Sequence, residues 1–135
     1  MKTYLITGGA GFVGSNLAID FKLNNPEIRV IAFDNLKRRG SELNLQRLSI
    51  NNVEFLHGDI RNREDLESIG HVDVIIECSA EPSVLAGFDS SPDYLINTNL
   101  LGTINCLEFA RKHHADFVFL STSRVYPVKT INNLK

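Results

Sequence analysis

The chain has 135 residues, which is enough for one globular domain and too few for two. A formal net charge of −2 gives no electrostatic reason to expect nucleic acid or a membrane as a partner. No apolar run is long enough to span a bilayer and the first residues do not form a secretory signal, so a cytoplasmic location is expected. The two cysteines, Cys78 and Cys106, lie in apolar patterns and are predicted to be buried free thiols. Neither they nor the four histidines have the spacing of a metal site.

Residues 1–16 combine a short strand, a glycine-rich turn and the start of a helix. The apolar run Tyr4–Ile6 is typical of a buried parallel strand, and a helical pattern follows from about Phe12 to Leu23. Between them lie four glycines: Gly8, Gly9, Gly11 and Gly14. The unpaired N–H groups at a helix start and the positive end of the helix dipole attract a phosphate group. The turn therefore predicts a pyrophosphate site, where glycines allow a tight turn and close backbone contacts.

A second strand, Arg29–Phe33, is followed by Asp34, which lies twenty residues after Gly14. A carboxylate at this place accepts hydrogen bonds from the adenosine ribose and repels a 2′-phosphate, which favours NAD over NADP. The basic run Lys37–Arg39 leaves an NADP site open, although such a run in a loop is usually just solvated. A P-loop is excluded, because Gly14 is followed by Ser15 without a lysine between them.

Strands and helices alternate along the rest of the chain. Further helices are expected at about Ser41–Ile50, Arg63–Ile69 and Pro92–His113, and further strands at Val53–His57, Val72–Cys78 and Asp116–Leu120. This alternation predicts an α/β fold, a doubly wound, Rossmann-like parallel sheet of about five strands in the order 3-2-1-4-5. The ligand of such a sheet lies beyond the carboxyl ends of the strands, at the switch point between the first and fourth strands.

The long helix carries two apolar faces. Ser91 is a suitable N-cap for it, with Pro92 in the first helical position. Asn99 shares one face, expected to pack on the sheet, with Leu95, Gly102, Cys106 and Phe109. A buried amide needs partners, so Asn99 is either a core asparagine with local bonds or a site residue. The opposite face predicts a second partner for the helix and consists of Ile96, Leu100, Ile104 and Leu107.

Five stretches of sequence, spread over nearly the whole chain, form a recognisable set. They are TGGAGFVG (Thr7–Gly14), FDNL (Phe33–Leu36), HGDI (His57–Ile60), NLLGT (Asn99–Thr103) and STSRVY (Ser121–Tyr126). In this order they resemble the extended short-chain dehydrogenases/reductases, which include the NAD-dependent nucleotide-sugar epimerases and dehydratases. The resemblance implies a nucleotide sugar as substrate and NAD as a bound cofactor. It implies an epimerisation in which hydride is removed to give a ketone and is then returned.

The resemblance also implies which residues surround the cofactor. Phe12 and Val13 cover the pyrophosphate beside Gly8, Gly11 and Gly14. The other implied contacts are Asp34, Asn35, Leu36 and Arg38 at the ribose, Asp59 and Ile60 at the adenine, and Ser79, Ala80 and Glu81 at the nicotinamide. Asn99 would hold a water or a backbone group near a catalytic lysine. From the residues alone, Asp59 is a turn residue or the cap of the next helix.

In STSRVY, Thr122 takes the position of the family's catalytic Ser/Thr, whose hydroxyl assists a tyrosine base. Ser123 and Arg124 stand where 4,6-dehydratases carry Asp-Glu, which disfavours that branch. The stretches Glu77–Val84 and Ser121–Pro127 look most like the CDP-paratose/CDP-tyvelose 2-epimerase branch. The enzyme alternatives are a UDP-sugar 4-epimerase or a relative of the 4,6-dehydratases. The alternative outside the enzymes is a non-catalytic NAD-binding module.

The family's Tyr-x-x-x-Lys pair is missing, because no lysine follows Tyr4, Tyr94 or Tyr126 at the fourth position. We therefore expect residues 1–135 to be the NAD-binding, N-terminal portion of a longer enzyme, inactive alone, without the sugar-binding C-terminal domain. The tail Thr130–Lys135 is expected to be a loop. In the family the long helix pairs with the next one at a dimer interface, which implies a homodimer acting on a CDP- or UDP-linked sugar.

Overall fold

The protein contains a single parallel sheet, seen in a computed structural model that describes residues 1–83, 85–122 and 128–133. The strands are β1 (Thr3–Thr7), β2 (Arg29–Asp34), β3 (Glu54–His57), β4 (Val74–Glu77) and β5 (Asp116–Phe119). Their order is β3-β2-β1-β4-β5, with every neighbouring pair parallel. The α/β doubly wound fold and the predicted strand order are therefore confirmed.

The helices alternate with the strands as expected. The α-helices are α1 (Phe12–Asn24), α2 (Leu45–Ile50), α3 (Arg63–Glu67), α4 (Asp93–Ile96), α5 (Thr103–His113) and α6 (Val128–Asn132). Two irregular turns accompany them, the 3₁₀ turn η1 (Ser41–Asn44) before α2 and the π-helical turn η2 (Asn97–Gly102) between α4 and α5. The expected tail loop is partly wrong, because Thr130 and the two residues after it belong to α6. The N-cap residue of α4 is Pro92 and not Ser91 as predicted, although the Ser91 hydroxyl does accept a hydrogen bond from the Asp93 N–H (3.2 Å).

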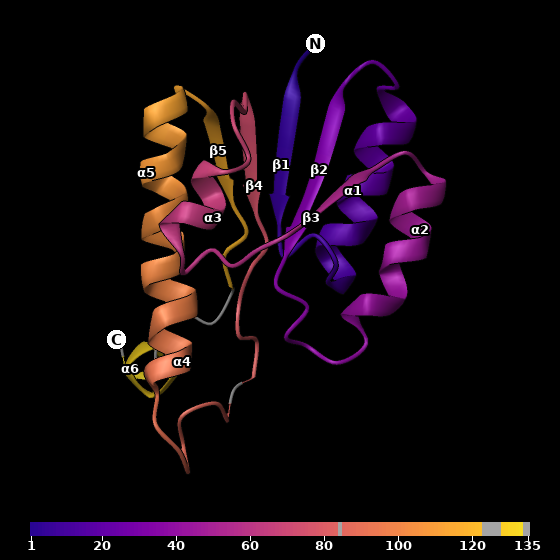
Figure 1. Cartoon of the computed structure of the whole chain (residues 1–135). Helices are drawn as coiled ribbons and strands as arrows, with labels where there is room; N and C mark the ends of the chain where they lie inside the picture. Colours follow the sequence, from indigo (N-terminus) through magenta and orange to yellow (C-terminus); the bar gives the residue numbers. More distant parts are fainter. Residues whose placement is uncertain (84, 123–127, 134–135) are drawn as a thin grey trace.

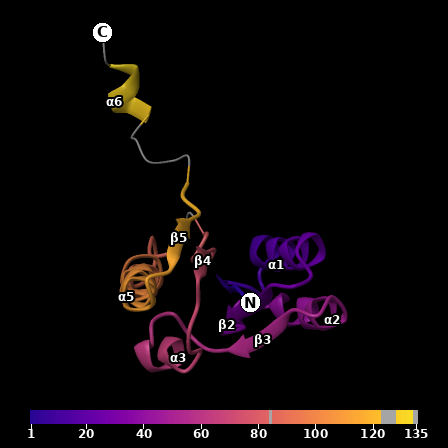
Figure 2. The ribbon, with the colours of Figure 1, turned by 90° about the horizontal axis from the view of Figure 1, so that it is seen from above.

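Helices cover both faces of the sheet, α1 and α2 on one side and α3 and α5 on the other (Figures 1 and 2). Leu5 of β1 is level with Ile31 and Ile75 in the neighbouring strands, and all three pack in the layer under α3 and α5. Ile6, the next residue, points to the α1 and α2 layer. Successive strand residues point to opposite faces, so a strand covered on both faces is apolar throughout.

The π turn η2 changes which residues of the long helix face the sheet. Thr98 and Gly102 are buried, whereas Asn99 is exposed, so the predicted burial of Asn99 is wrong. The prediction assumed 3.6 residues per turn, but the wider i→i+5 turn holds about one residue more, which shifts by one position the residues before Gly102 that face the sheet. Gly102 packs closely on Ile60, and a Cβ atom there would push the end of the Ile60 side chain aside. The turn thus brings Thr98, rather than Asn99, to the inner face.

The opposite face of the long helix is exposed in this chain. Its apolar side chains are 40–56% exposed and are those of Ile96, Leu100, Ile104 and Leu107. Among the described residues, no helix is long and apolar enough to cross a membrane. Cys106 is buried as predicted, whereas Cys78 is only half-buried because it lies at the carboxyl end of β4, where the sheet opens into a cleft.

Candidate cofactor site

A cleft of about 570 Å³ lies at the carboxyl ends of β1–β4, within the size range of small-molecule sites. The predicted site residues that line it are Gly8, Gly11, Phe12, Val13, Gly14, Asp34, Asn35, Arg38, Asp59, Ile60, Ser79, Ala80 and Glu81. Leu36, Asn99 and Thr122 do not line it. The fold thus brings most of the residues implied by the resemblance together in one cleft, from the ends of four strands.

The glycine turn places the start of α1 against the end of β1. Gly8 has a φ of +62°, which only glycine adopts at little cost, and the Gly11 N–H donates to its carbonyl (2.9 Å). A Cβ atom on Gly14 would overlap the Gly8 carbonyl. The turn can therefore close only with glycine at both places. The first N–H groups of α1, from Phe12 onward, point out of the helix start, where an anion is favoured.

Asp34 joins the turn to the end of β2. Its carboxylate accepts hydrogen bonds from the N–H of Ala10 (3.1 Å) and the N–H of Leu36 (2.8 Å), one on each oxygen. The second bond explains the left-handed φ of +54° at Leu36, since the chain folds back over the carboxylate. A carboxylate has about four acceptor positions, so one remains on each oxygen. This is what a ribose with two adjacent hydroxyls requires.

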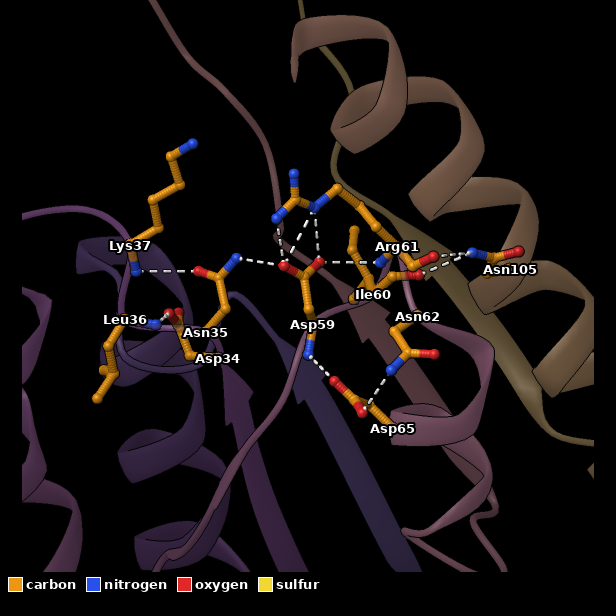
Figure 3. A network of polar contacts seen from close by, with 10 residues as sticks. All are labelled: Asp34, Asn35, Leu36, Lys37, Asp59, Ile60, Arg61, Asn62, Asp65 and Asn105. Atoms are coloured by element: carbon orange, nitrogen blue, oxygen red, sulfur yellow. Dashed lines mark hydrogen bonds and ion pairs between the residues drawn. The ribbon is translucent and has the colours of Figure 1, made fainter. Parts of the chain in front are cut away.

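Asp59, after β3, lies in a polar network drawn in Figure 3. Its carboxylate accepts hydrogen bonds from Arg61 and from the Asn35 side chain, and its N–H donates to Asp65. Partial burial raises the pKa of Asp59, but the hydrogen bonds from Arg61 and Asn35 outweigh it and lower the pKa to about 2. Its N–H bond to Asp65 also ties it to α3, as a turn residue would be.

The loop after β4 is held by the long helix. Asn99 accepts a hydrogen bond from the N–H of Glu81 (2.7 Å) and donates one to its carbonyl (3.2 Å). Asn99 therefore fixes the loop of Ser79, Ala80 and Glu81 at the cleft without lining it. Burial, followed by the nearby Glu77 carboxyl, raises the pKa of Cys78 to about 11, so this thiol is not a nucleophile at neutral pH.

Thr98 and Tyr94 line the cleft and were not among the predicted site residues, whereas Lys37 was weighed as part of a possible NADP site. Thr98 is 7% exposed, lines the cleft, and its hydroxyl is the one buried side-chain N or O atom without a partner among the described residues. Tyr94 also lines the cleft, and the Lys37 ammonium lies 3.4 Å from the centre of its ring. The Lys37 ammonium therefore contacts an aromatic ring and is not surrounded by water alone. No sequence signal for Thr98 existed, because the π turn that buries it is not visible in the helical pattern.

Glu77 is a further missed residue, a carboxyl that is 1% exposed at the end of β4. Its side chain lies 2.7 Å from the Thr103 hydroxyl, at the start of α5, and 3.5 Å from the Thr7 hydroxyl of β1. Burial raises its pKa, and the hydrogen bonds from Thr103, Ser79 and Thr7 only partly offset this. The sequence signal was an acid inside an apolar strand, Val72–Cys78.

Thr122 is exposed after β5 and makes an interaction of its own, while Ser123, Arg124 and Tyr126 lie outside the described residues. Within the described part of the chain, no group of three or more His, Cys, Asp or Glu side chains could hold a metal ion. The polar groups that line the cleft are backbone amides, side-chain amides and hydroxyls, the carboxylates of Asp34, Asp59 and Glu81, and the cations of Lys37 and Arg38. Such a lining suits a polar organic ligand with phosphate groups.

Comparison with known proteins identifies the family. The sequence pattern of the NAD dependent epimerase/dehydratase family matches residues 4–133. The chain belongs to this family. The resemblance inferred from the five motifs is thereby confirmed.

Members of the epimerase/dehydratase family with different activities are similar to this chain. CDP-paratose 2-epimerase from Salmonella typhi is 39% identical over 90% of this chain and 37% of its own. A bifunctional UDP-glucose and UDP-xylose 4-epimerase from Pisum sativum is 34% identical over 90% of this chain and 37% of its own. The Bacillus anthracis dTDP-glucose 4,6-dehydratase, solved with NAD, is 31% identical with a TM-score of 0.76, over 90% of this chain and 38% of its own. The chain thus spans less than two fifths of these relatives.

Proposed function

We propose that this chain is the NAD-binding part of an epimerase of a nucleotide-linked sugar. The observation that carries the proposal is the hydrogen bond of 3.1 Å between the Ala10 N–H and Asp34. It joins the helix start that suits a pyrophosphate to the carboxylate that suits a ribose. One rigid unit can therefore hold both halves of an adenosine diphosphate group.

The residues of the cleft fit NAD. Asp34 keeps an acceptor position on each oxygen, and its charge repels the 2′-phosphate that distinguishes NADP. Thr98 lines the cleft, and its buried hydroxyl has no hydrogen-bond partner among the described residues. The closed turn at Gly8 and Gly14 leaves no side chain where a pyrophosphate would lie.

NAD, when bound, supplies a hydride acceptor that can return the hydride, so no external oxidant is consumed. In our proposal the first amides of α1 bind the pyrophosphate, beneath Phe12 and Val13. The loop Ser79–Glu81, held by Asn99, borders the nicotinamide and excludes water from it. Thr122 would orient the reacting sugar hydroxyl, and a tyrosine base would come from outside residues 1–135.

The similarity to CDP-paratose 2-epimerase supports a CDP-linked sugar as substrate. The similarity to the pea enzyme supports a UDP-sugar 4-epimerase as the second candidate. Ser123, which replaces the acid expected of a dehydratase, disfavours elimination of water. We further propose that the whole protein is longer, with a sugar-binding domain, and acts in the cytoplasm as a homodimer.

Two measurements test the proposal. Calorimetric titration of the protein with NAD and with NADP should show tighter binding of NAD, and the absence of NAD binding would contradict the proposed cofactor. The whole enzyme should then convert CDP-paratose to CDP-tyvelose, followed by NMR of the sugar protons. Conversion of UDP-glucose to UDP-galactose instead would favour the 4-epimerase. If neither sugar is converted, the remaining function is that of a non-catalytic NAD-binding module.

A further inference from the structure

The loop of residues 35–43 begins and ends at contacts with the same residue of the glycine turn, Ala10. Before the loop, the Asp34 carboxylate accepts a hydrogen bond from the Ala10 N–H (3.1 Å). After the loop, the Asn44 side-chain amide donates a hydrogen bond to the Ala10 carbonyl (2.9 Å). Ala10 is fully buried, so water cannot replace either partner of its backbone groups. The two hydrogen bonds therefore close the loop onto the glycine turn.

This loop forms one wall of the cleft. Its cleft-lining residues are Asn35, Lys37, Arg38 and Ser41. Ser41 is buried, whereas the run Lys37–Arg39 is exposed to solvent. The position of the loop relative to the glycine turn therefore determines the shape of the cleft beside β2.

Further hydrogen bonds set the orientation of the Asn44 amide. Arg47 of α2 donates from Nη1 to Asn44 Oδ1 (3.0 Å), which leaves the amide nitrogen for the Ala10 carbonyl. Arg47 Nη2 donates to Asn16 Oδ1 (3.0 Å), and Asn16 Nδ2 donates to the Phe12 carbonyl (2.7 Å). Ala10 and Phe12 flank the N-cap residue of α1. The network thus holds the chain on both sides of the point where α1 begins.

The attachment of α2 to the sheet does not depend on this network. Leu48 of α2 is completely buried, in the same apolar layer as Ala18 of α1. Asn44 is half-buried and Arg47 is exposed, so neither side chain belongs to that layer. Loss of their hydrogen bonds should therefore leave the apolar core in place and release the loop from the glycine turn.

We infer that Asn44 is a positioning residue for the cofactor, which with Arg47 holds the loop and the glycine turn in the arrangement that binds a dinucleotide. The inference rests on the proposed binding of NAD. Without the hydrogen bond from Asn44, the loop has to be ordered when the ligand binds, and the affinity falls with the fraction of molecules whose loop is already closed. The loss of one neutral hydrogen bond changes such an affinity by about three- to tenfold.

Two measurements on Asn44→Ala test the inference, calorimetric titration with NAD and limited digestion by trypsin without NAD. The affinity for NAD should fall about three- to tenfold. Trypsin should cleave faster within Lys37–Arg39, measured by mass spectrometry of the fragments, because cleavage follows the population of the open loop. Cleavage at Lys112, in α5, should not change, which distinguishes opening of the loop from a less stable fold.

Asn51→Ala is the matched control. Asn51 lies at the opposite end of α2, and its side chain donates to the carbonyl of Arg47 (2.8 Å), a bond between near neighbours in sequence. This variant should keep both the NAD affinity and the cleavage rates of the wild type.

An Asn44→Ala variant that binds NAD as tightly as the wild type would overturn the inference. A weaker affinity with unchanged cleavage of the loop would also overturn it, since Asn44 would then act without holding the loop. If the wild type binds no NAD, the cofactor proposal fails, and this inference fails with it whatever the digestion shows. If Asn44→Ala does not fold, Arg47→Met replaces it and should change both quantities in the same direction by smaller factors, because the Asn44 amide is then free to turn; unchanged values would contradict the inference.

Discussion

The buried Glu77 carboxyl makes the stability of the fold depend on pH in a way that one substitution removes. Glu77→Gln keeps the shape of the side chain and its hydrogen-bonding capacity, since an amide N–H can donate to the Thr103 hydroxyl and the amide oxygen can accept from Ser79. It removes only the proton that the acid can lose. Any change in the pH dependence of unfolding can then be assigned to that proton.

The size of the effect follows from proton linkage. Burial raises the pKa of Glu77 in the folded protein above the ordinary value of 4.5. Above pH 4.5 the unfolded chain loses this proton, while the folded state still holds it. Each pH unit in that range lowers the free energy of unfolding by about 1.4 kcal/mol, so stability is lost as the pH rises toward the folded-state pKa. For a chain of 135 residues this is roughly 5 °C in melting temperature per pH unit.

Urea unfolding of the wild type and of Glu77→Gln, followed by circular dichroism from pH 4 upward, measures the difference. The two proteins should be nearly equally stable at the lowest pH, and the variant should become more stable relative to the wild type as the pH rises. Glu27→Gln, at an exposed position, controls for the loss of one acidic group. Parallel pH profiles for the wild type and Glu77→Gln would refute the reasoning.

Three further predictions concern the site and the assembly. Asp34→Ala should weaken NAD binding about 10–100-fold, because charge-assisted ribose bonds are lost, and should narrow the gap to NADP in calorimetry; an unchanged NAD affinity would contradict it. In the whole enzyme, Thr122→Ala should lower turnover by about two to four orders of magnitude with NAD binding kept, and Thr122→Ser should retain much of the rate; wild-type turnover by the alanine variant would remove Thr122 from the mechanism. The whole enzyme should be a dimer by light scattering at micromolar concentration, and Leu100→Glu, on the exposed apolar face, should shift it toward monomer; a monomeric wild type would argue against the interface.

The parts of the fold that were predictable depend on local patterns. Tyr4–Ile6 and Arg29–Phe33 are apolar on both faces because each strand is covered by helices on both sides, and this pattern can be read without the structure. The glycine-rich turn directly follows β1 and Asp34 ends β2, so the strand order alone brings them to one edge of the sheet.

The parts that were not predictable depend on a backbone irregularity or on contacts between distant residues. Thr98 is buried in place of Asn99 because the turn η2 is wider than an α-helical turn. The polarity pattern of the helix does not indicate this wider turn. Arg61 lies two residues after Asp59 in the sequence, but its contact with Tyr94 of α4 joins segments more than thirty residues apart. The hydrogen bonds from Arg61 to Asp59 are local, whereas the hydrogen bond from Asn35 depends on the pairing of β2 with β3.

The central position of β1 has a consequence for synthesis of the protein. β1 leaves the ribosome before β2 and β4, yet it lies between them, and its Tyr4 pairs with Val74. At about 5–20 residues per second, the 70 residues from Tyr4 to Val74 take roughly 4–14 s to translate. During that interval one edge of an apolar strand has no native neighbour. Slower elongation would lengthen the exposure of this edge to other nascent chains, and a chaperone that binds short apolar segments would protect it.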